Sequence, residues 1–230
     1  EKAEFVRLIG HDLLAPLRNI EGMVDSILRK SDGLSPEDLR ERLARVLVNT
    51  ELEQSMLIDV LELSRLGVAQ EQPEVVDSLE VAHEVAGAFE HDLQRLRIEL
   101  SIREPMPVLL IERARLRHVL QNLVDNAIKY MGDSAERGIV VSANSGPLGA
   151  SFTVSDTGPG IPDEEHEKVF QLFRRASTAP EGVAGKGVGL ASVKAMVERW
   201  NGSLTLISQE GKGCRFVCTV PPERVASGHW

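Results

Sequence analysis

Apolar residues recur at helical spacing through the first thirty positions of the chain. On a wheel that advances by about 100° per residue, these residues lie within about 40° of Leu13: Val6, Ile9, Leu17, Ile20, Val24 and Ile27. The stripe predicts one amphipathic helix roughly 45 Å long, because each helical residue adds about 1.5 Å.

A turn and a second helix follow this stripe. Gly33 can end the first helix, and Ser35 with Pro36, followed by two acidic residues, can begin another. Apolar residues at spacings of three and four continue to about Leu66. We therefore expect an antiparallel two-helix hairpin over residues 1–67. Such a hairpin buries little by itself, so the long stripe predicts a homodimer through these residues, with a four-helix bundle as its core.

The pattern changes after a predicted linker at residues 68–74. Two segments read as helices, 112–131 and 189–200, and two hairpins are expected from alternating runs. The expected strands are 97–102, 138–144, 150–156, 203–208 and 214–220. We predict an α+β chain in which the helical hairpin is followed by a domain over residues 75–222, with helices over a mostly antiparallel sheet, and a tail at 223–230.

Composition narrows the function classes. The net charge of −9 argues against a nucleic-acid partner, which would require clustered Lys and Arg. The two cysteines, Cys214 and Cys218, have no histidine or further cysteine at ligand spacing, and they fit a reducing compartment. No apolar run approaches the ~20 residues that span a membrane. Because the sequence begins at Glu1, inside a helical pattern, we expect a cytoplasmic fragment of a longer protein, in which any membrane segment would lie upstream.

The first helix carries a candidate nucleophile. His11 falls about 160° from Leu13, on the polar face. Asp12 can accept a hydrogen bond from Nδ1–H of an imidazole, which leaves Nε2 with a lone pair. Pro16 cannot donate to the carbonyl of Asp12 and bends the helix one turn later. The alternative is an ordinary surface histidine in a tolerated kink.

Two glycine-rich segments and a polar helix face suggest nucleotide binding. Asp156 is expected at a strand end in "DTGPGIP", where its carboxylate could accept from an exocyclic amine. The segment "GKGVGLA", residues 185–191, opens a helix, whose N–H groups can bind phosphate. Asn122, Asn126 and Lys129 share one face of the helix before these loops. Amide oxygens suit Mg²⁺ and an ammonium suits phosphate, although a polar face can also be merely solvated.

Together these motifs resemble those of sensor histidine kinases of two-component signalling. "GHDLLAPL" is similar to the H-box, "NLVDNAIKY" to the N-box, "DTGPGIP" to the G1 box, "VFQLF" to the F-box and "GKGVGL" to the G2 box. The resemblance covers residues 1–222, with all five motifs in order. It implies a dimerisation and histidine-phosphotransfer hairpin followed by an α/β sandwich of the Bergerat ATP-binding type.

The resemblance also implies roles for individual residues. His11 would attack the γ-phosphate of ATP, Asp12 would orient it and accept its proton, and Asn126 would hold Mg²⁺. The phosphoryl group would then pass to an aspartate of a response-regulator receiver domain. The implied nucleotide-binding residues are Asn122, Asn126, Lys129, Tyr130, Asp156, Gly158, Gly160, Arg175, Gly185, Lys186, Gly187, Val188, Gly189 and Leu190.

The chain departs from the family pattern at several positions. Ala15 stands where a polar residue commonly positions water for dephosphorylating the regulator, so weak or absent phosphatase activity is expected. Lys186 is expected to contact phosphate, with a solvated side chain as the alternative. Trp200 begins a turn that is commonly His-Gly-Gly, and Glu112 stands where aspartate is frequent. Neither of these two is expected to matter for function.

Two other functions fit parts of the pattern. A related ATP hydrolase, such as gyrase or the heat-shock chaperone, would use a glutamate four residues before Asn126 to activate water. Asn122 occupies that position and is no general base. A non-catalytic scaffold would bind nucleotide without phosphorylating itself, and the intact His11 and Asp156 argue against it.

Overall fold

A computed structural model describes the chain at residues 17–18, 20–29, 34–43, 45–47, 49–50, 72–132, 136–171 and 189–226. The chain divides into two compact units, Glu1–Gly67 and Val68–Trp230. Each unit is described by itself. Over the described ranges, no helix combines the length and the apolar character needed to cross a membrane.

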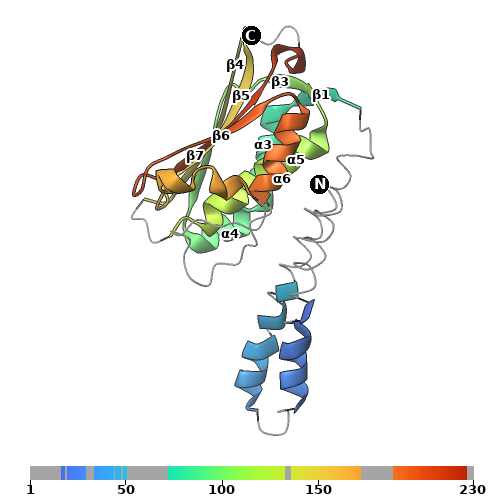
Figure 1. Cartoon of the computed structure of the whole chain (residues 1–230), viewed down its shortest axis with the longest axis vertical. Helices are drawn as coiled ribbons and strands as arrows, with labels where there is room; N and C mark the ends of the chain where they lie inside the picture. The colour runs from blue at the N-terminus through green and yellow to red at the C-terminus, as the bar shows by residue number, and fades with distance from the viewer. Residues whose placement is uncertain are drawn as a thin grey trace. The chain divides into compact units, whose positions relative to one another are not determined.

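Two helices run side by side in the described part of the first unit (Figure 1). The first covers residues 17–18 and 20–29, and the second covers 36–43, 45–47 and 49–50. The predicted start of the second helix is confirmed, because Oγ of Ser35 accepts a hydrogen bond from the backbone N–H of Asp38 at 3.1 Å. This bond satisfies one of the N–H groups that have no partner within the helix. Gly33, the predicted end of the first helix, lies outside the described residues.

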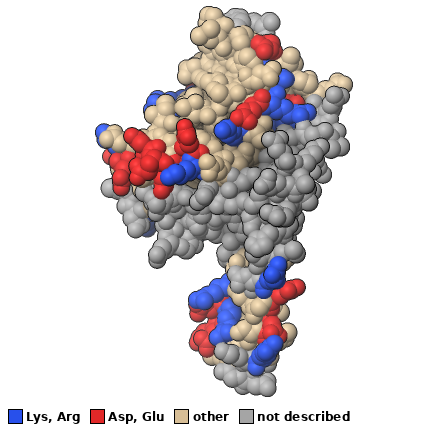
Figure 2. Space-filling model, viewed as in Figure 1, with Lys and Arg blue, Asp and Glu red and all other residues tan. Residues whose placement is uncertain are grey.

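The apolar stripe of the hairpin divides into a buried part and an exposed part. Ile27 is 8% exposed, and Arg42 of the second helix donates to Oγ of Ser26 at 3.4 Å. Apolar side chains also remain on the outside: Leu17 at 44%, Val24 at 38%, Leu43 at 46% and Leu47 at 62% exposure. Acidic and basic side chains are interspersed along the same unit, without a continuous basic surface on the visible face (Figure 2).

A five-stranded sheet forms the centre of the second unit. Its order is β2-β4-β5-β7-β6, with β2 parallel to β4 and the other neighbours antiparallel. The mostly antiparallel sheet and both predicted hairpins are therefore confirmed. The strands are β2 (Glu99–Arg103), β4 (Gly138–Gly146), β5 (Gly149–Asp156), β6 (Ser203–Ser208) and β7 (Cys214–Val220).

Three helices cover one face of this sheet (Figure 1): α3 (Ser78–Ala88), α5 (Arg113–Lys129) and α6 (Gly189–Arg199). The alternation along β5 produces the core, since Phe152 and Val154 are each 1% exposed while the residues between them point to the other face. The helices contribute buried aliphatic side chains at spacings of three and four: Leu116, Val119, Leu120 and Leu123 from α5, and Val193, Met196 and Val197 from α6.

Some elements were not predicted. β1 (Glu74–Asp77) pairs antiparallel with β3 (Val108–Ile111) in a separate two-stranded sheet. Neither α3 nor the short helix α4 (Glu90–Leu96) that follows it was predicted. Segments of four to seven residues are too short to show a period, so long-range pairing decides their conformation.

The chain still contacts the second unit just after residue 222, the predicted end of the domain. The short helix η4 (Pro222–Arg224) is followed by Val225, which is 5% exposed and bridges to Leu109 of β3. The N–H of Ala226 also donates to the carbonyl of Val108 at 2.9 Å. At the other end, β1 begins at Glu74, one residue inside the predicted linker.

Trp200, which was expected to matter little for function, lies in the core. Trp200 is 1% exposed, and it is the largest fully buried side chain among the described residues. Its Nε1 donates to Oε2 of Glu112 at 2.7 Å, and Nη1 of Arg115 donates to Oε1 of the same carboxylate at 2.9 Å. The two departures from the family pattern, Trp200 and Glu112, thus contact each other.

Candidate nucleotide site

The C-terminal half of α5 supplies one side of the candidate site. Asn122, Asn126 and Lys129 are half-buried on a flank of the helix, and the apolar residues between them enter the core. Nζ of Lys129 lies 2.5 Å from Oδ2 of Asp125, one turn earlier on α5. Asp125, which the sequence analysis did not name, therefore holds the ammonium that was predicted to contact phosphate.

Asp156 ends β5 and is held by backbone donors. Its Oδ1 accepts hydrogen bonds from the N–H of Gly158 at 2.9 Å and from the N–H of Cys214 at 3.2 Å. Burial raises the pKa of Asp156, and these two hydrogen bonds oppose the rise only in part. Among the described residues Oδ2 accepts no hydrogen bond, so one carboxylate oxygen is positioned rigidly and the other can accept from an amine.

The two glycines after Asp156 allow close approach by the chain itself. A Cβ on Gly158 would lie 3.0 Å from the carbonyl oxygen of Tyr130, at the end of α5. Gly160 has a φ of +73°, and a Cβ there would lie 2.1 Å from the carbonyl oxygen of Gln209 in the β6–β7 turn. The loop is therefore clamped between α5 and this turn.

Ser208, at the end of β6, reinforces the clamp. Its Oγ accepts from the N–H of Ile161 at 2.9 Å and donates to the carbonyl of Gly213 at 2.7 Å. One hydroxyl thus joins the loop after β5 to the β6–β7 turn that also supplies the N–H of Cys214. Ser208 was not predicted for the site, because only the pairing of β6 with β7 brings it to this loop.

The start of α6 supplies the opposite side. A Cβ on Gly189 would lie 2.4 Å from Oδ1 of Asn122, so any larger residue there would require the amide of Asn122 to move. Nδ2 of Asn122 donates to the carbonyl of His118 at 3.1 Å, which turns its oxygen towards α6. Leu190 is half-buried in the first turn of α6. The motif that contains Asn122 and the motif that contains Gly189, 67 residues apart, therefore contact each other here.

The segment after the G1 loop packs on α6 and β7. It contains the short helices η2 (Asp163–Glu165) and η3 (Lys168–Phe170). Phe170 meets Phe216 of β7 edge to face, with ring centroids 6.4 Å apart, and Nζ of Lys194 lies 5.9 Å from the centre of the Phe170 ring. These contacts anchor the beginning of the F-box. The structure does not describe several residues predicted for the site: His11, Asp12, Arg175, Gly185, Lys186, Gly187 and Val188.

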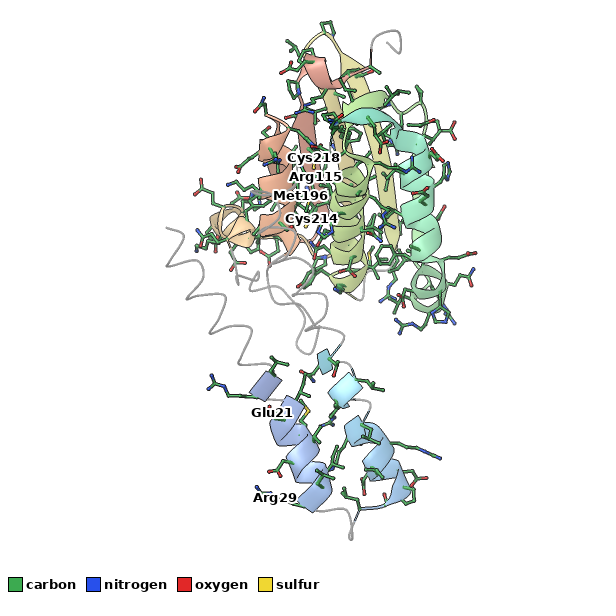
Figure 3. The ribbon with its side chains drawn as sticks, turned by 90° about the vertical axis from the view of Figure 1, so that its right-hand side faces the viewer. Glu21, Arg29, Arg115, Met196, Cys214 and Cys218 are labelled. Atoms are coloured by element: carbon green, nitrogen blue, oxygen red, sulfur yellow. The ribbon has the colours of Figure 1, made fainter. Side chains whose placement is uncertain are left out.

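Both cysteines lie on β7 as free thiols and are labelled in Figure 3. Burial raises the pKa of Cys218 to about 12. Burial, together with the charge of Asp156, raises the pKa of Cys214 to about 11. Both groups are thus protonated at neutral pH, and Cys214 contributes its backbone N–H rather than its sulfur.

A separate surface cavity of about 600 Å³ lies between α3, α4 and β2. Leu93, Ile98 and Leu100 line it together with charged groups such as Glu90 and Arg97. None of the residues predicted for the nucleotide site contributes to its walls.

Comparisons with known proteins agree with this geometry. Residues 111–224 match the family described as "Histidine kinase-, DNA gyrase B-, and HSP90-like ATPase". The chain is 33% identical over 221 residues to the methanogenesis regulatory histidine kinase FilI of Methanothrix harundinacea, a match that covers 96% of this chain and 25% of that protein. The chain thus spans about a quarter of the length of this relative.

Two solved structures extend the likeness to the whole fold. Full-length ShkA, in complex with AMPPNP, superposes with a TM-score of 0.67 at 25% identity, covering 99% of this chain and 47% of that chain. The histidine kinase ThkA, in complex with the response regulator TrrA, gives a TM-score of 0.72 at 22% identity, covering 95% and 61%. The described α+β fold is therefore the one these kinases share.

Replacing Asp156 by asparagine tests the site through stability and binding together. Because burial raises the pKa of Asp156 in the folded chain, its charged form costs folding free energy at neutral pH. This cost shrinks as the pH falls through the raised pKa of the folded chain, and it disappears below about 4, where the carboxyl group becomes protonated in the unfolded chain as well. We expect Asp156→Asn to raise the Tm at neutral pH, and this gain to shrink as the pH is lowered.

The same substitution should weaken ADP binding, since the amide NH₂ would face the adenine amine, donor against donor. Calorimetric titration measures the affinity and a thermal scan measures the Tm. Asp163→Asn is the matched control, because the side chain of Asp163 is 93% exposed; it should change neither quantity. A lower Tm for Asp156→Asn at neutral pH would contradict the argument.

Proposed function

Since the chain belongs to the sensor histidine kinases and contains their catalytic region, we propose that it is an ATP-dependent autokinase that phosphorylates its own His11. ATP binds between α5, the loop after β5 and the start of α6. Nε2 of His11 attacks the γ-phosphorus, ADP leaves, and Asp12 takes the imidazole proton. Both residues lie outside the described ranges, so their roles rest on the sequence and on the family.

The observation that carries the proposal is the convergence of three motifs on one site. The carbonyl of Tyr130 meets Gly158, and the side chain of Asn122 meets Gly189. Asp156, the proposed adenine acceptor, thus lies at one edge of this flank of α5. The N-terminus of α6, which attracts phosphate, lies at the other edge. Arg175, Gly185, Lys186, Gly187 and Val188 complete the phosphate contacts in the proposal.

The same flank suits a magnesium–nucleotide complex. In the described ranges, no group of three His, Cys, Asp or Glu side chains is placed to hold a metal ion. Mg²⁺ commonly keeps several waters and binds through substrate phosphates with only one or two protein oxygens. The amide oxygen of Asn126, half-buried next to Asp125, fits that need. The bound ion would neutralise phosphate charge.

Transfer to histidine fits this chain better than transfer to water. Asn122 directs its side-chain oxygen towards Gly189, and an amide cannot remove a proton from water at neutral pH. His11 supplies a nucleophile that needs only a proton acceptor. The phosphoryl group then passes to an aspartate of a response-regulator receiver domain, the class of partner held by ThkA in its complex. A sensor domain upstream, in a longer protein that is cytoplasmic or membrane-anchored, would control the reaction.

The first testable consequence is a phosphohistidine. Wild-type protein incubated with γ-labelled ATP and Mg²⁺ should acquire acid-labile, alkali-stable label, and His11→Ala should acquire none, because no other group replaces Nε2. His83→Ala, which removes an exposed histidine on α3, should label like the wild type. Free phosphate without labelled protein would instead indicate a hydrolase, and bound nucleotide with neither product would indicate a scaffold.

The second consequence concerns hydrolysis of the phosphorylated regulator. Ala15 lies outside the described residues, and its methyl group cannot hold a water molecule by hydrogen bonding. We expect little dephosphorylation of the phosphorylated regulator, and an increase with Ala15→Thr, whose hydroxyl can position water. Measured release of phosphate from the regulator tests this. Substantial phosphate release by the wild type that falls when Asp12 is replaced would contradict this expectation.

The third consequence is a dimer through residues 1–67. Leu47 is 62% exposed on the hairpin, and burying a charge there without a partner is costly. Leu47→Asp should therefore shift the chain from dimer to monomer in analytical ultracentrifugation. Arg40→Asp introduces the same side chain at an exposed position of the same helix and should leave the dimer intact. A wild-type chain that sediments as a monomer would contradict the proposal.

A further inference from the structure

A buried cluster joins the beginning of α5 to the end of α6. Glu112 precedes α5 and is 7% exposed, Arg115 in its first turn is 4% exposed, and Trp200 just after α6 is 1% exposed. The Glu112 carboxylate accepts from both neighbours, from Nη1 of Arg115 at 2.9 Å and from Nε1 of Trp200 at 2.7 Å. Each of its two oxygens therefore has a defined partner.

The cluster and the start of α6 lie at opposite ends of the same helix pair. From Glu112 to Asn122 is about 15 Å along α5, and from Trp200 back to Gly189 is about 16 Å along α6, at roughly 1.5 Å per residue. The helices run side by side (Figure 3, with Arg115 on α5 and Met196 on α6 labelled). One end is held by the cluster, and the other brings Gly189 against Asn122.

Between these ends the contact is aliphatic. Leu116, Leu120 and Leu123 of α5 and Val193 and Met196 of α6 are all buried. Apolar burial is itself non-directional, so between these ends the axial position of α6 is set only by how the side chains interdigitate. A hydrogen bond from a buried indole to a carboxylate loses its strength when length or angle changes. The cluster is thus the directional contact that can select the register.

We propose that Glu112, Arg115 and Trp200 are positioning residues for the phosphate end of the nucleotide site. They fix the register of α6 on α5, and through it the place of the first N–H groups of α6 beside Asn122. The inference rests on the proposed function, because it concerns the same ATP site. It separates that site into two parts: the phosphate side depends on the cluster, while Asp156 is held independently by Gly158 and Cys214.

The test compares two ligands on the full chain. Trp200→Phe keeps an aromatic ring in the core but replaces the indole, with its N–H donor, by a smaller phenyl ring. The Kd for ATP with Mg²⁺ should rise roughly five-fold, within the range for residues that act through a packed element. The Kd for adenosine, which lacks phosphates, should stay within about two-fold. In the labelling assay, the KM for ATP should rise by the same factor as the Kd.

Val193→Ala is the control for stability alone. Val193 is 0% exposed on the same helix, so its truncation should lower the Tm while leaving the Kd for ATP unchanged. Should Trp200→Phe fail to fold, Glu112→Gln is measured instead. It keeps the side-chain volume, but an amide offers only one acceptor oxygen to two donors, and the same selective loss of ATP affinity is expected.

The outcomes separate the two proposals. A wild-type chain that does not bind ATP overturns the proposed function and this inference together. Wild-type binding with equal ATP affinity in the substituted chain overturns the inference alone. A loss of ATP and adenosine affinity by the same factor also overturns the inference. The same holds if Val193→Ala loses as much ATP affinity as Trp200→Phe.

Discussion

At the first residue of α6, the backbone lies so close to the side chain of Asn122 that a single methyl group on Gly189 would be 2.4 Å from its oxygen. The candidate site depends on this approach, because it brings the N-terminus of one helix to the polar flank of another. A helix N-terminus attracts phosphate only within its first turn. A small shift of α6 along α5 would therefore move the N–H groups away from that flank, which gives the buried Glu112–Trp200 contact its importance.

The other edge of the candidate site holds a carboxyl group that is destabilising in its charged form. Asp156 is buried, and the pKa of its carboxyl group is raised, so its charge is kept at a cost. Its partners are two backbone N–H groups, which do not neutralise it as an arginine would. A charge held in this way remains a strong acceptor for a ligand amine. Functional sites commonly keep such destabilising groups, because selection acts on function above a stability threshold.

The helical hairpin buries only part of its apolar surface within one chain. Ile27 is covered within one chain, whereas Leu43 and Leu47 are left with 46% and 62% of their surface exposed. An amphipathic hairpin has too few apolar positions to build a closed core alone, and a second copy would supply the missing face. In the proposed kinase, the same helices would then carry the dimer contact on one side and His11 on the other.

The amino-acid pattern alone was enough for the elements whose period or turn residues are clear in the sequence. The Ser35 cap, the β4–β5 and β6–β7 hairpins, and the shared flank of Asn122 and Asn126 follow from fixed periods along a helix or a strand. The pattern could not place contacts between distant segments: Trp200 with Glu112, Gly160 with Gln209, or Ser208 with Ile161. Trp200 was read as a harmless turn residue, since nothing local marks a side chain as the centre of a core. Such partners are chosen only when the sheet and its helices pack, because excluded volume and buried polar groups then leave one arrangement in which each donor meets an acceptor.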